Sequence, residues 1–220
     1  MVSIASASAE AQIRFTLDES EPTGTSPLYR APFEVKETTV VRAKAFKGGQ
    51  ESHVTNQLVD ILAWHEAAQI QNAVNGLDYT YYENGDWSGF PDLASLTPVK
   101  TGTVENVGIG PAAVDAGYGL KFMGFVRVPE DGIYTFYGRS TELSRLAVDD
   151  ATLVMTQSRK REKSARIALK AGLHSIEMSA YFRAEDEKRT LEMSYEGPGV
   201  PKQAIPSSAL FRVEPQPGKG

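Results

Sequence analysis

Apolar residues recur at every second position through most of the chain, and this period restricts the fold more than any other feature. A β-strand points successive side chains to opposite faces of a sheet, so a period of two predicts strands with one buried face and one solvated face. Residues 176–182 illustrate it, because Ile176, Met178 and Ala180 alternate with Glu177 and Ser179. The sequence therefore predicts an all-β protein.

Similar segments occur at both ends of the chain, separated by turn-forming residues. Residues 13–17 and 41–45 alternate near the start, and residues 133–137 alternate after a Pro-Glu-Asp-Gly turn at 129–132. Many short strands with Pro, Gly, Asn and Asp between them are typical of sandwiches and barrels.

Two later segments look like the arms of hairpins. We expect residues 176–182 to pair with residues 191–195 around the turn-like 185–188, with the apolar face of each arm inward. A second, longer hairpin is expected between Met155 and Ile167. Residues 59–76 break the period and are rich in Ala and Gln, so they are interpreted as a connector that could hold a helical turn.

The composition excludes several classes of protein. With 41% hydrophobic and 23% charged residues the chain is globular rather than disordered. A net charge of −5 argues against nucleic acid as a partner, and no apolar run approaches the roughly 18 residues needed to span a membrane. Cysteine is absent, which excludes disulfides, thiol nucleophiles and cysteine metal sites. No signal peptide is visible at the start, so we expect a fragment of a longer protein.

The first strands and the turn between them resemble a known small domain. Residues 13–18 (IRFTLD), 20–23 (SEPT), 26–29 (SPLY) and 39–46 (TVVRAKAF) are similar to the chitobiase/β-hexosaminidase C-terminal domain. That family is an immunoglobulin-like sandwich found beside the catalytic domains of bacterial glycosidases and sulfatases. Its turn usually reads Asp-Gly-Ser, and Glu19 stands at the Gly position, which should cost some stability if the position needs a positive φ.

The rest of the chain resembles the protective-antigen-type β-sandwich of anthrax toxin, the domain called PA-fourteen. By resemblance, such domains are glycan-binding or spacer modules in glycosidases, adhesins and toxins. The segments that carry the resemblance follow in the same order: 76–79 (GLDY), 122–129 (FMGFVRVP), 132–136 (GIYTF), 144–146 (SRL), 169–174 (LKAGLH) and 195–199 (YEGPG).

Together the two resemblances predict two all-β domains. A small immunoglobulin-like β-sandwich is expected over residues 1–58, and a larger protective-antigen-type β-sandwich or barrel over residues 77–214. Residues 59–76 connect them, and residues 215–220 form a tail.

Asp149 and Asp150 are the sharpest candidates for ligand binding. In sugar-binding members of the resembled family, an aspartate pair near this loop holds calcium, which holds sugar hydroxyls. Those members carry Asp-Asp-Gly ahead of Ser-Arg-Leu, where this chain has Thr141, Glu142 and Leu143. Calcium takes about 6–8 oxygen ligands, so Glu142, Asp149 and Asp150 are too few, and calcium is a weak expectation. The alternative, which we favour, is that Asp149-Asp150 turns a hairpin.

Tyr79, Tyr81, Tyr82 and Trp87 form the richest aromatic segment. Aromatic rings stack on the C–H faces of sugars, so Tyr82 and Trp87 are candidate carbohydrate-binding residues. The period of two places Tyr79 and Tyr81 on one face and Tyr82 on the other, so at least one face is expected to be buried. Core packing is the favoured interpretation.

Catalysis by this chain is not expected. Glycoside hydrolysis needs two carboxylates roughly 5–10 Å apart, and the acidic residues occur in turn-like contexts with nothing to pair them. His53, His65 and His174 lie in unrelated contexts, and His174 is interpreted as structural. The basic run at 159–163 is expected to be a solvated hairpin tip because the chain is acidic overall.

The resemblances imply a non-catalytic accessory region of a glycoside hydrolase, either β-hexosaminidase-like or, alternatively, a sulfatase. Its expected role is to bind carbohydrate or to position an upstream catalytic domain, and the alternative is a purely structural spacer with no ligand. The expected partners are a glycan or polysaccharide and that upstream domain. The expected location is the periplasm or cell surface of a bacterium, with the signal peptide outside this sequence.

Overall fold

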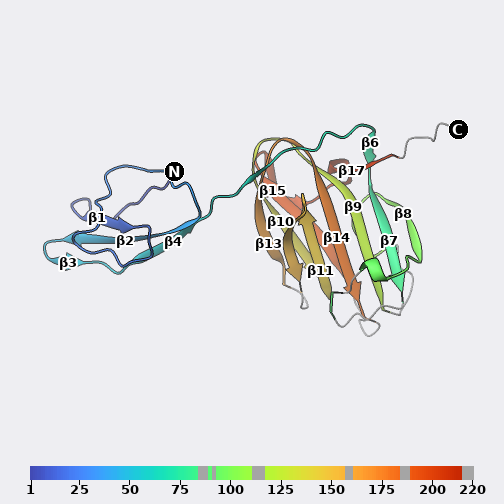
Figure 1. Cartoon of the computed structure of the whole chain (residues 1–220), viewed down its shortest axis with the longest axis horizontal. Helices are drawn as coiled ribbons and strands as arrows, with labels where there is room; N and C mark the ends of the chain where they lie inside the picture. Colours follow the sequence, from blue (N-terminus) through green and yellow to red (C-terminus); the bar gives the residue numbers. More distant parts are fainter. Residues whose placement is uncertain (84–88, 91–92, 111–116, 157–160, 184–188, 215–220) are drawn as a thin grey trace. The chain divides into compact units, whose positions relative to one another are not determined.

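The structure is a computed structural model that describes residues 1–83, 89–90, 93–110, 117–156, 161–183 and 189–214. The elements in this part of the chain are strands and two short 3-10 turns, Leu93–Ser95 and Ser207–Ala209, without an α-helix. The expected all-β class is therefore confirmed. The chain divides into two units, Met1–Leu62 and Ala63–Gly220 (Figure 1).

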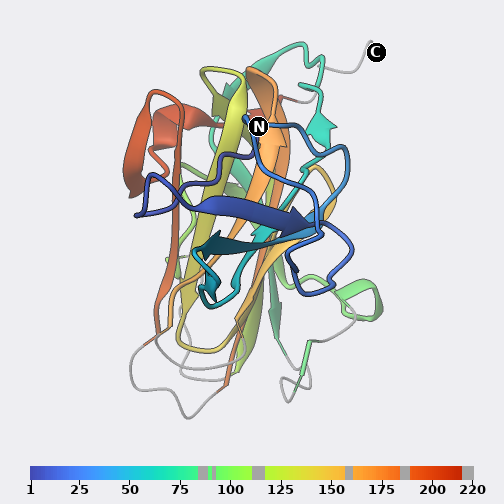
Figure 2. The same cartoon turned by 90° about the vertical axis from the view of Figure 1, so that its left-hand side faces the viewer.

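The first unit is built on an antiparallel sheet. Its central strand is β2 (Thr39–Lys47), which pairs with β1 (Gln12–Thr16) along one edge (Figure 2). The other edge pairs with β3 (Gln50–Glu51) and β4 (Thr55–Val59). A two-residue turn, Gly48-Gly49, joins β2 to β3, and both glycines have the positive φ that such a turn requires.

Aromatic rings cover one face of this sheet. Val41 and Ala43 of β2 are buried, and Phe15 lies opposite Ala43 in the register. The ring centroids of Phe15 and Phe33 are 4.7 Å apart, and Tyr29 contacts both rings edge-on. The expected period of two therefore packs its apolar side chains into this small core.

The turn after β1 is held by side-chain hydrogen bonds. Ser20 donates to Asp18 Oδ1 from its backbone nitrogen at 3.1 Å and from Oγ at 2.6 Å, and Thr16 Oγ1 donates to the Ser20 carbonyl at 2.6 Å. Glu19, at the position where the resembled turn usually has Gly, has φ +62° and so occupies the left-handed region. The Arg42 guanidinium donates to the Glu19 carbonyl. The turn at residues 18–20 is thus part of the scaffold of the first unit.

The second unit contains two sheets. The five-stranded sheet is antiparallel except for its β13–β5 pair, and its strands in order are β16 (Val200–Ala204), β15 (Leu191–Gly197), β10 (Gly132–Ser140), β13 (Lys163–Leu169) and β5 (Trp64–His65). The main path of the eight-stranded sheet is β12 (Ala151–Thr156), β11 (Leu143–Val148), β14 (Gly172–Phe182), β9 (Tyr118–Val128), β17 (Leu210–Val213) and β6 (Ala73–Asn75). Its remaining strands are β7 (Leu77–Glu83), which pairs with β9, and β8 (Lys100–Val104), which pairs with β7.

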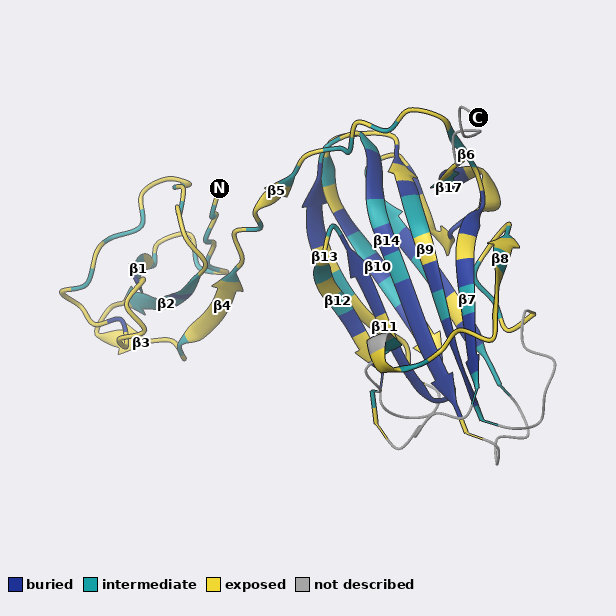
Figure 3. Cartoon of the chain, turned by 45° about the vertical axis from the view of Figure 1, so that its right-hand side comes forward, coloured by how far each residue is buried: buried dark blue, intermediate teal, exposed yellow. Residues whose placement is uncertain are grey.

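The inner faces of the two sheets enclose one apolar core (Figure 3). Tyr134 and Phe136 of β10 enter it from the five-stranded sheet, and Phe122 of β9 and Met178 of β14 enter it from the other sheet. All four are at most 1% exposed. The expected inward face of residues 176–182 is therefore confirmed.

Both expected hairpins are wrong, because the consecutive strands belong to different sheets. β14 pairs with β9 and β11, whereas β15 pairs with β10 and β16. In the same way β12 pairs with β11, whereas β13 pairs with β10 and β5. The chain crosses from one sheet to the other after Thr156 and after Phe182. Each arm buries one apolar face, and that pattern suits either arrangement.

The expected helical turn in residues 59–76 is also wrong. Part of this segment adds to the second unit as strands β5 and β6. Lys170 N donates to the His65 carbonyl at 3.0 Å, and Ala68 N donates to the Leu173 carbonyl at 2.8 Å. These bonds and the strand pairs satisfy part of the segment's backbone at a sheet edge, without a helix.

Candidate functional site

Asp149 and Asp150 form the two-residue turn that joins β11 to β12. Both have positive φ, 47° and 64°, which is the combination found in a type I′ hairpin turn. Aspartate tolerates this left-handed region better than most residues because its short side chain can bond the nearby backbone. The turn interpretation therefore accounts for the backbone of the pair.

The Asp149 carboxylate contacts the start of β14. Its Oδ1 accepts hydrogen bonds from Ser175 N at 2.9 Å and from Ser175 Oγ at 3.4 Å. Its Oδ2 lies 2.5 Å from Nδ1 of His174 and 3.8 Å from Nδ1 of His65 on β5. One carboxylate thus ties the turn, β14 and the first strand of the second unit together.

His174 is fully buried, and both of its ring nitrogens face acceptors. Nε2 lies 2.7 Å from the Lys170 carbonyl, while Nδ1 faces the Asp149 carboxylate. A carbonyl oxygen and an ionised carboxylate both accept hydrogen bonds, so this geometry favours the doubly protonated, positively charged ring. Burial by itself lowers the pKa of His174, but the hydrogen bonds to Asp149 and Lys170 outweigh it and raise the pKa above its ordinary value. His65 and His174, unrelated in the sequence, both approach the Asp149 carboxylate.

Glu142 lies at the opposite end of β11 from the aspartate turn. Glu142 and Asp149 flank the six residues of β11, so at about 3.3 Å per residue their Cα atoms are about 23 Å apart. Glu142 is 7% exposed, and its Oε2 lies 3.6 Å from Nη2 of Arg183. No small ligand can touch Glu142 and the aspartates together.

The residues named from the sequence do not fit a calcium ion. The Asp149 carboxylate is already engaged by His174 and Ser175, and Glu142 is too distant to join it. Within the described residues there is no group of three or more His, Cys, Asp or Glu side chains that could hold a metal. Calcium needs about 6–8 oxygens, which this turn does not gather.

The tyrosines of β7 are buried on both faces of the sheet. Tyr79 and Tyr81 join the main core, whereas Tyr82 packs with Tyr181 in a second apolar cluster. Tyr82 is 6% exposed, so its ring offers no free face for a sugar. Trp87, the other aromatic candidate, lies outside the described residues.

The outer face of the eight-stranded sheet carries a groove of about 430 Å³. This volume lies within the range of small-molecule sites. The groove crosses β7, β9, β14 and β11 and reaches the aspartate turn and the end of β17. Its principal side chains are Asp78, Met123, Arg145, Asp150, Glu177 and Val213. We call it the sheet groove.

Strand pairing aligns the side chains of the sheet groove in a row. Asp78 of β7 lies opposite Met123 of β9, Met123 lies opposite Glu177 of β14, and Glu177 lies opposite Ala147 of β11. Adjacent strands are about 4.8 Å apart, so the row is about 14 Å long. It therefore suits an extended ligand that lies across the strands.

The middle of the row combines an ordered carboxylate with an exposed apolar side chain. Lys121 Nζ lies 2.9 Å from Oε2 of Glu177, and Ser179 Oγ donates to Oε1 at 3.4 Å. Met123, beside it, is 48% exposed. Glu177 can accept hydrogen bonds from a ligand in a fixed direction while Met123 packs against an apolar surface of that ligand.

Among the described site residues expected from the sequence, only Asp150 lines the sheet groove. Asp78 and Met123 lie in segments that carry the PA-fourteen resemblance, but neither they nor Glu177 are named as candidate ligand-binding residues. The period of two marks them as outward-facing, but it does not tell which strands are neighbours. That parity is the one signal by which they could have been found.

Residues 159–160 of the basic run lie outside the described residues, and residues 161–163 are described and exposed. Where the run is described, Lys163 is exposed at the start of β13. Among the described residues, no helix has the length and apolarity to cross a membrane.

Two family models match consecutive parts of the chain. The chitobiase/beta-hexosaminidase C-terminal domain matches residues 1–56, and the PA14 domain matches residues 73–209. Both resemblances noted in the sequence are therefore confirmed, and the second match covers more than half of the chain.

A beta-hexosaminidase of Porphyromonas gingivalis (strain ATCC BAA-308 / W83) is 31% identical over 176 residues, which cover 74% of this chain and 22% of that protein. The chain thus spans only a minor part of its curated relative.

Two solved structures share the fold. An anti-sigma factor domain-containing protein from Clostridium clariflavum has a TM-score of 0.52 and 21% identity, covering 78% of this chain and 60% of that one. The PA14 sugar-binding domain from an RTX adhesin has a TM-score of 0.50 and 16% identity, covering 63% of this chain and 99% of that one.

Proposed function

This chain belongs to the PA14 family, and we propose that it is a non-catalytic accessory region that binds carbohydrate through its second unit. The observation that carries the proposal is the sheet groove, where Asp78, Met123 and Glu177 form one row across three strands. The domain from the RTX adhesin, which has the same fold, is described as sugar-binding.

The chemistry of the sheet groove suits a sugar. A sugar ring presents hydroxyls at its edge and C–H groups on its faces, so its site needs ordered polar groups beside apolar surface. Glu177 is oriented by Lys121, and Met123 and Val213 are 48% and 42% exposed next to the polar groups. Asp150, the candidate from the sequence, contributes a further carboxylate at the end of the row.

The charges that line the sheet groove favour some sugars over others. Asp78, Asp150 and Glu177 supply three carboxylates, and Arg145 supplies one positive charge. Like charges across an interface disfavour binding, so sulfated and uronic sugars are excluded. The preferred ligand is a neutral oligosaccharide or one that contains amino sugars. Binding needs no calcium, because the ion-paired Asp149 is not free to hold it.

We further propose that the parent protein is a glycoside hydrolase of the β-hexosaminidase type, exported to the periplasm or surface of a bacterium. The Porphyromonas relative supports this, since the matched region is 22% of its length and leaves ample chain for a catalytic domain. A tethered sugar-binding region keeps the catalytic domain near its polymer and raises the effective substrate concentration.

A structural spacer is the second candidate, and the first unit supplies the observation that favours it. Leu17, Leu58 and Ile61 are 42%, 53% and 45% exposed there, and an adjoining domain could cover them. As a spacer the chain would bind no glycan.

A glycan array distinguishes these functions. The folded chain is applied once with calcium and once with a chelator. We expect signal on neutral or amino-sugar glycans that the chelator does not change. Silence in both runs supports the spacer, and a calcium-dependent signal lost in Asp149→Ala contradicts the calcium-free site.

Variants then place the binding on the sheet groove. Glu177→Gln and Met123→Ala should each weaken the array signal severalfold, because one removes an oriented acceptor and the other removes apolar contact. The matched control is Glu192→Gln, an exposed carboxylate on β15 of the other sheet, 3.6 Å from Arg139. Equal loss in Glu192→Gln and Glu177→Gln would refute the assignment.

A further inference from the structure

We propose that the first unit carries a second binding site, for a neutral oligosaccharide, in a groove between the loop at 21–24 and the β2–β3 hairpin. The groove has a volume of about 920 Å³, and we call it the hairpin groove. Only the choice of ligand class rests on the carbohydrate role proposed for the second unit. Its principal side chains are Gln12, Glu21, Lys44, Phe46, Gln50 and Glu51.

The hairpin groove forms on the face of the sheet that does not pack on the aromatic core. Val41 and Ala43 of β2 point to the aromatic core. Because side chains alternate along a strand, Lys44 and Phe46 point to the opposite face of the sheet. Gln12 of β1 and Glu51 of β3 both lie opposite Phe46 in the register. Three strands therefore place an amide, a ring and a carboxylate in one row.

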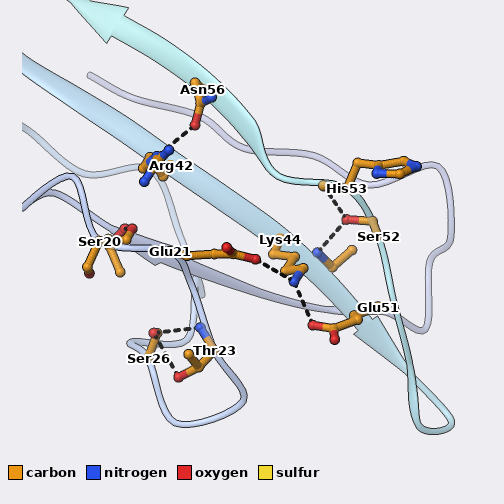
Figure 4. Close-up of polar contacts among 12 residues, drawn as sticks. Ser20, Glu21, Thr23, Ser26, Arg42, Lys44, Glu51, Ser52, His53 and Asn56 are labelled. Carbon is orange, nitrogen blue, oxygen red and sulfur yellow. Dashed lines mark hydrogen bonds and ion pairs between the residues drawn. The ribbon is translucent and has the colours of Figure 1, made fainter.

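Lys44 organises the polar side of the hairpin groove. Its side chain is only 12% exposed, and its Nζ lies 2.9 Å from Oε1 of Glu21 and 2.7 Å from Oε2 of Glu51. Figure 4 shows the two carboxylates approaching this ammonium from different segments, Glu21 from the loop and Glu51 from the strand. The hydrogen bonds to Glu51 and Glu21 raise the pKa of Lys44, and the bond from Lys44 lowers the pKa of Glu21, so the charges persist at neutral pH.

The two carboxylates keep capacity for a ligand. A carboxylate offers about four acceptor positions, and Lys44 occupies one on each. The side chains of Glu21 and Glu51 are 62% and 56% exposed, so the other positions face solvent. They are fixed acceptors for the hydroxyl groups of a sugar.

An apolar wall and a bare turn complete the hairpin groove. Phe46 is half-buried and presents its ring where a sugar C–H face can pack. The turn residues Gly48 and Gly49 line the same groove, and nothing lies within 4 Å of where a Cβ would stand on either of them. The rim at the turn is therefore open backbone.

The charge pattern selects a neutral ligand. Besides Glu21, Lys44 and Glu51, the rim holds a second pair in which Lys47 Nζ lies 2.9 Å from Oε2 of Glu10. Both lysines are therefore engaged by carboxylates, and three carboxylates line the groove. These carboxylates repel an anionic ligand, whereas a neutral polyol can hydrogen-bond to them without breaking an ion pair.

These ion pairs contribute little to stability. Solvent screens exposed salt bridges, and holding long side chains in one geometry costs entropy. What they supply is a set of polar groups already ordered beside a ring, which lowers the entropic cost of binding.

The test is a two-dimensional ¹⁵N NMR titration of the full chain. The neutral probes are chitotriose, cellotriose and galactotriose, and trigalacturonic acid is the anionic comparison. We expect saturable shifts of the Gln12, Phe46, Gly48 and Glu51 amides with at least one neutral trisaccharide and none with the anion. Absence of shifts in the first unit with every neutral probe overturns the proposal.

Variants check that the shifts report this groove. The double variant Glu21→Gln and Glu51→Gln keeps the shape of both side chains but removes their charge, and it should weaken binding about fivefold or more. Glu37→Gln, an exposed carboxylate elsewhere in the first unit, is the matched control. The dispersion of each spectrum shows that the variant is folded. Unchanged affinity in the double variant overturns the assignment.

The same spectra separate this site from the sheet groove. Shifts confined to Met123, Glu177 and their neighbours overturn the second site and leave the proposed function standing. Shifts confined to the first unit support the second site and count against the sheet groove.

Discussion

Replacing Asp149 with asparagine removes the charge that holds the buried imidazolium of His174. The Nδ1–Oδ2 distance is 2.5 Å, and the His174 side chain has no exposure to solvent. A hydrogen bond between charged partners contributes about 1.5–3 kcal/mol, and breaking a buried pair costs about 3–5 kcal/mol. Asp149 retains 18% exposure, and asparagine can still accept one hydrogen bond, so we expect a loss of about 2–3 kcal/mol near pH 6.

The loss of stability caused by Asp149→Asn should decrease as the pH rises. The pKa of His174 is raised in the folded protein above its ordinary value of 6.5, so the folded state binds this proton more tightly than the unfolded chain. The resulting stabilisation is complete below about pH 6.5 and is lost as the pH rises through the folded-state pKa. The difference between the parent chain and Asp149→Asn should therefore shrink between pH 6 and pH 9.

Urea unfolding followed by tryptophan fluorescence measures this difference. The chain has two tryptophans, Trp64 and Trp87, and both belong to the second unit, so the signal follows that unit alone. With a slope of about 2 kcal/mol per molar urea, the midpoint should fall by about 1–1.5 M at pH 6. Asp150→Asn is the control, because it alters the neighbouring residue of the same positive-φ turn. Equal effects of the two substitutions, or a cost that is the same at both pH values, would refute the ion-pair reasoning.

Three further changes test the fold and the binding sites. Glu19→Gly should stabilise the first unit by about 0.5–1 kcal/mol, since glycine adopts the observed φ of +62° without a Cβ penalty. Calorimetry would detect this gain, and the control Glu19→Ala should not show it. Gly197→Ala should cost roughly 1–3 kcal/mol in urea unfolding, because its Cβ would lie 2.3 Å from Cδ1 of the fully buried Tyr134. The control Gly24→Ala should cost far less, because no atom lies within 4 Å of the place its Cβ would take. Tyr82→Ala should lower the free energy of unfolding by about 3–5 kcal/mol, because it leaves a cavity in the second apolar cluster. The glycan affinity of the folded variant should be unchanged. Loss of binding without loss of stability would make Tyr82 a sugar contact.

Much of the local structure follows from the sequence. The alternation at 176–182 correctly indicates which side chains of β14 face the core, and Glu19, which stands at the Gly position of the resembled turn, has a positive φ. These features depend on residues close together in the chain, where the strand period and the sterics of single residues decide the outcome. The paired glycines at 48 and 49 are predictable as a turn for the same reason.

The pairing of the strands does not follow from the sequence. Residues 176–182 and 191–195 each have one apolar face, a pattern that fits a hairpin as well as two facing sheets, and the structure places them in different sheets. For the same reason the candidate site cannot be predicted from the sequence. Asp78, Met123 and Glu177 are distant in sequence and become neighbours only through the register of β7, β9 and β14. His65 and His174 converge on Asp149 for a similar reason, since β5 adds to a sheet edge that no local pattern marks.

The sequence by itself determines the all-β class, the order of two domain types and the orientation of side chains along each strand. These depend on a period of two and on motifs that are contiguous in the chain. Tertiary structure alone decides which strands are neighbours, and hence which outward-facing residues gather in the sheet groove and which buried charges find partners. The physical reason is that long-range pairing is selected by the joint burial of many apolar faces, and each face considered singly is compatible with several partners.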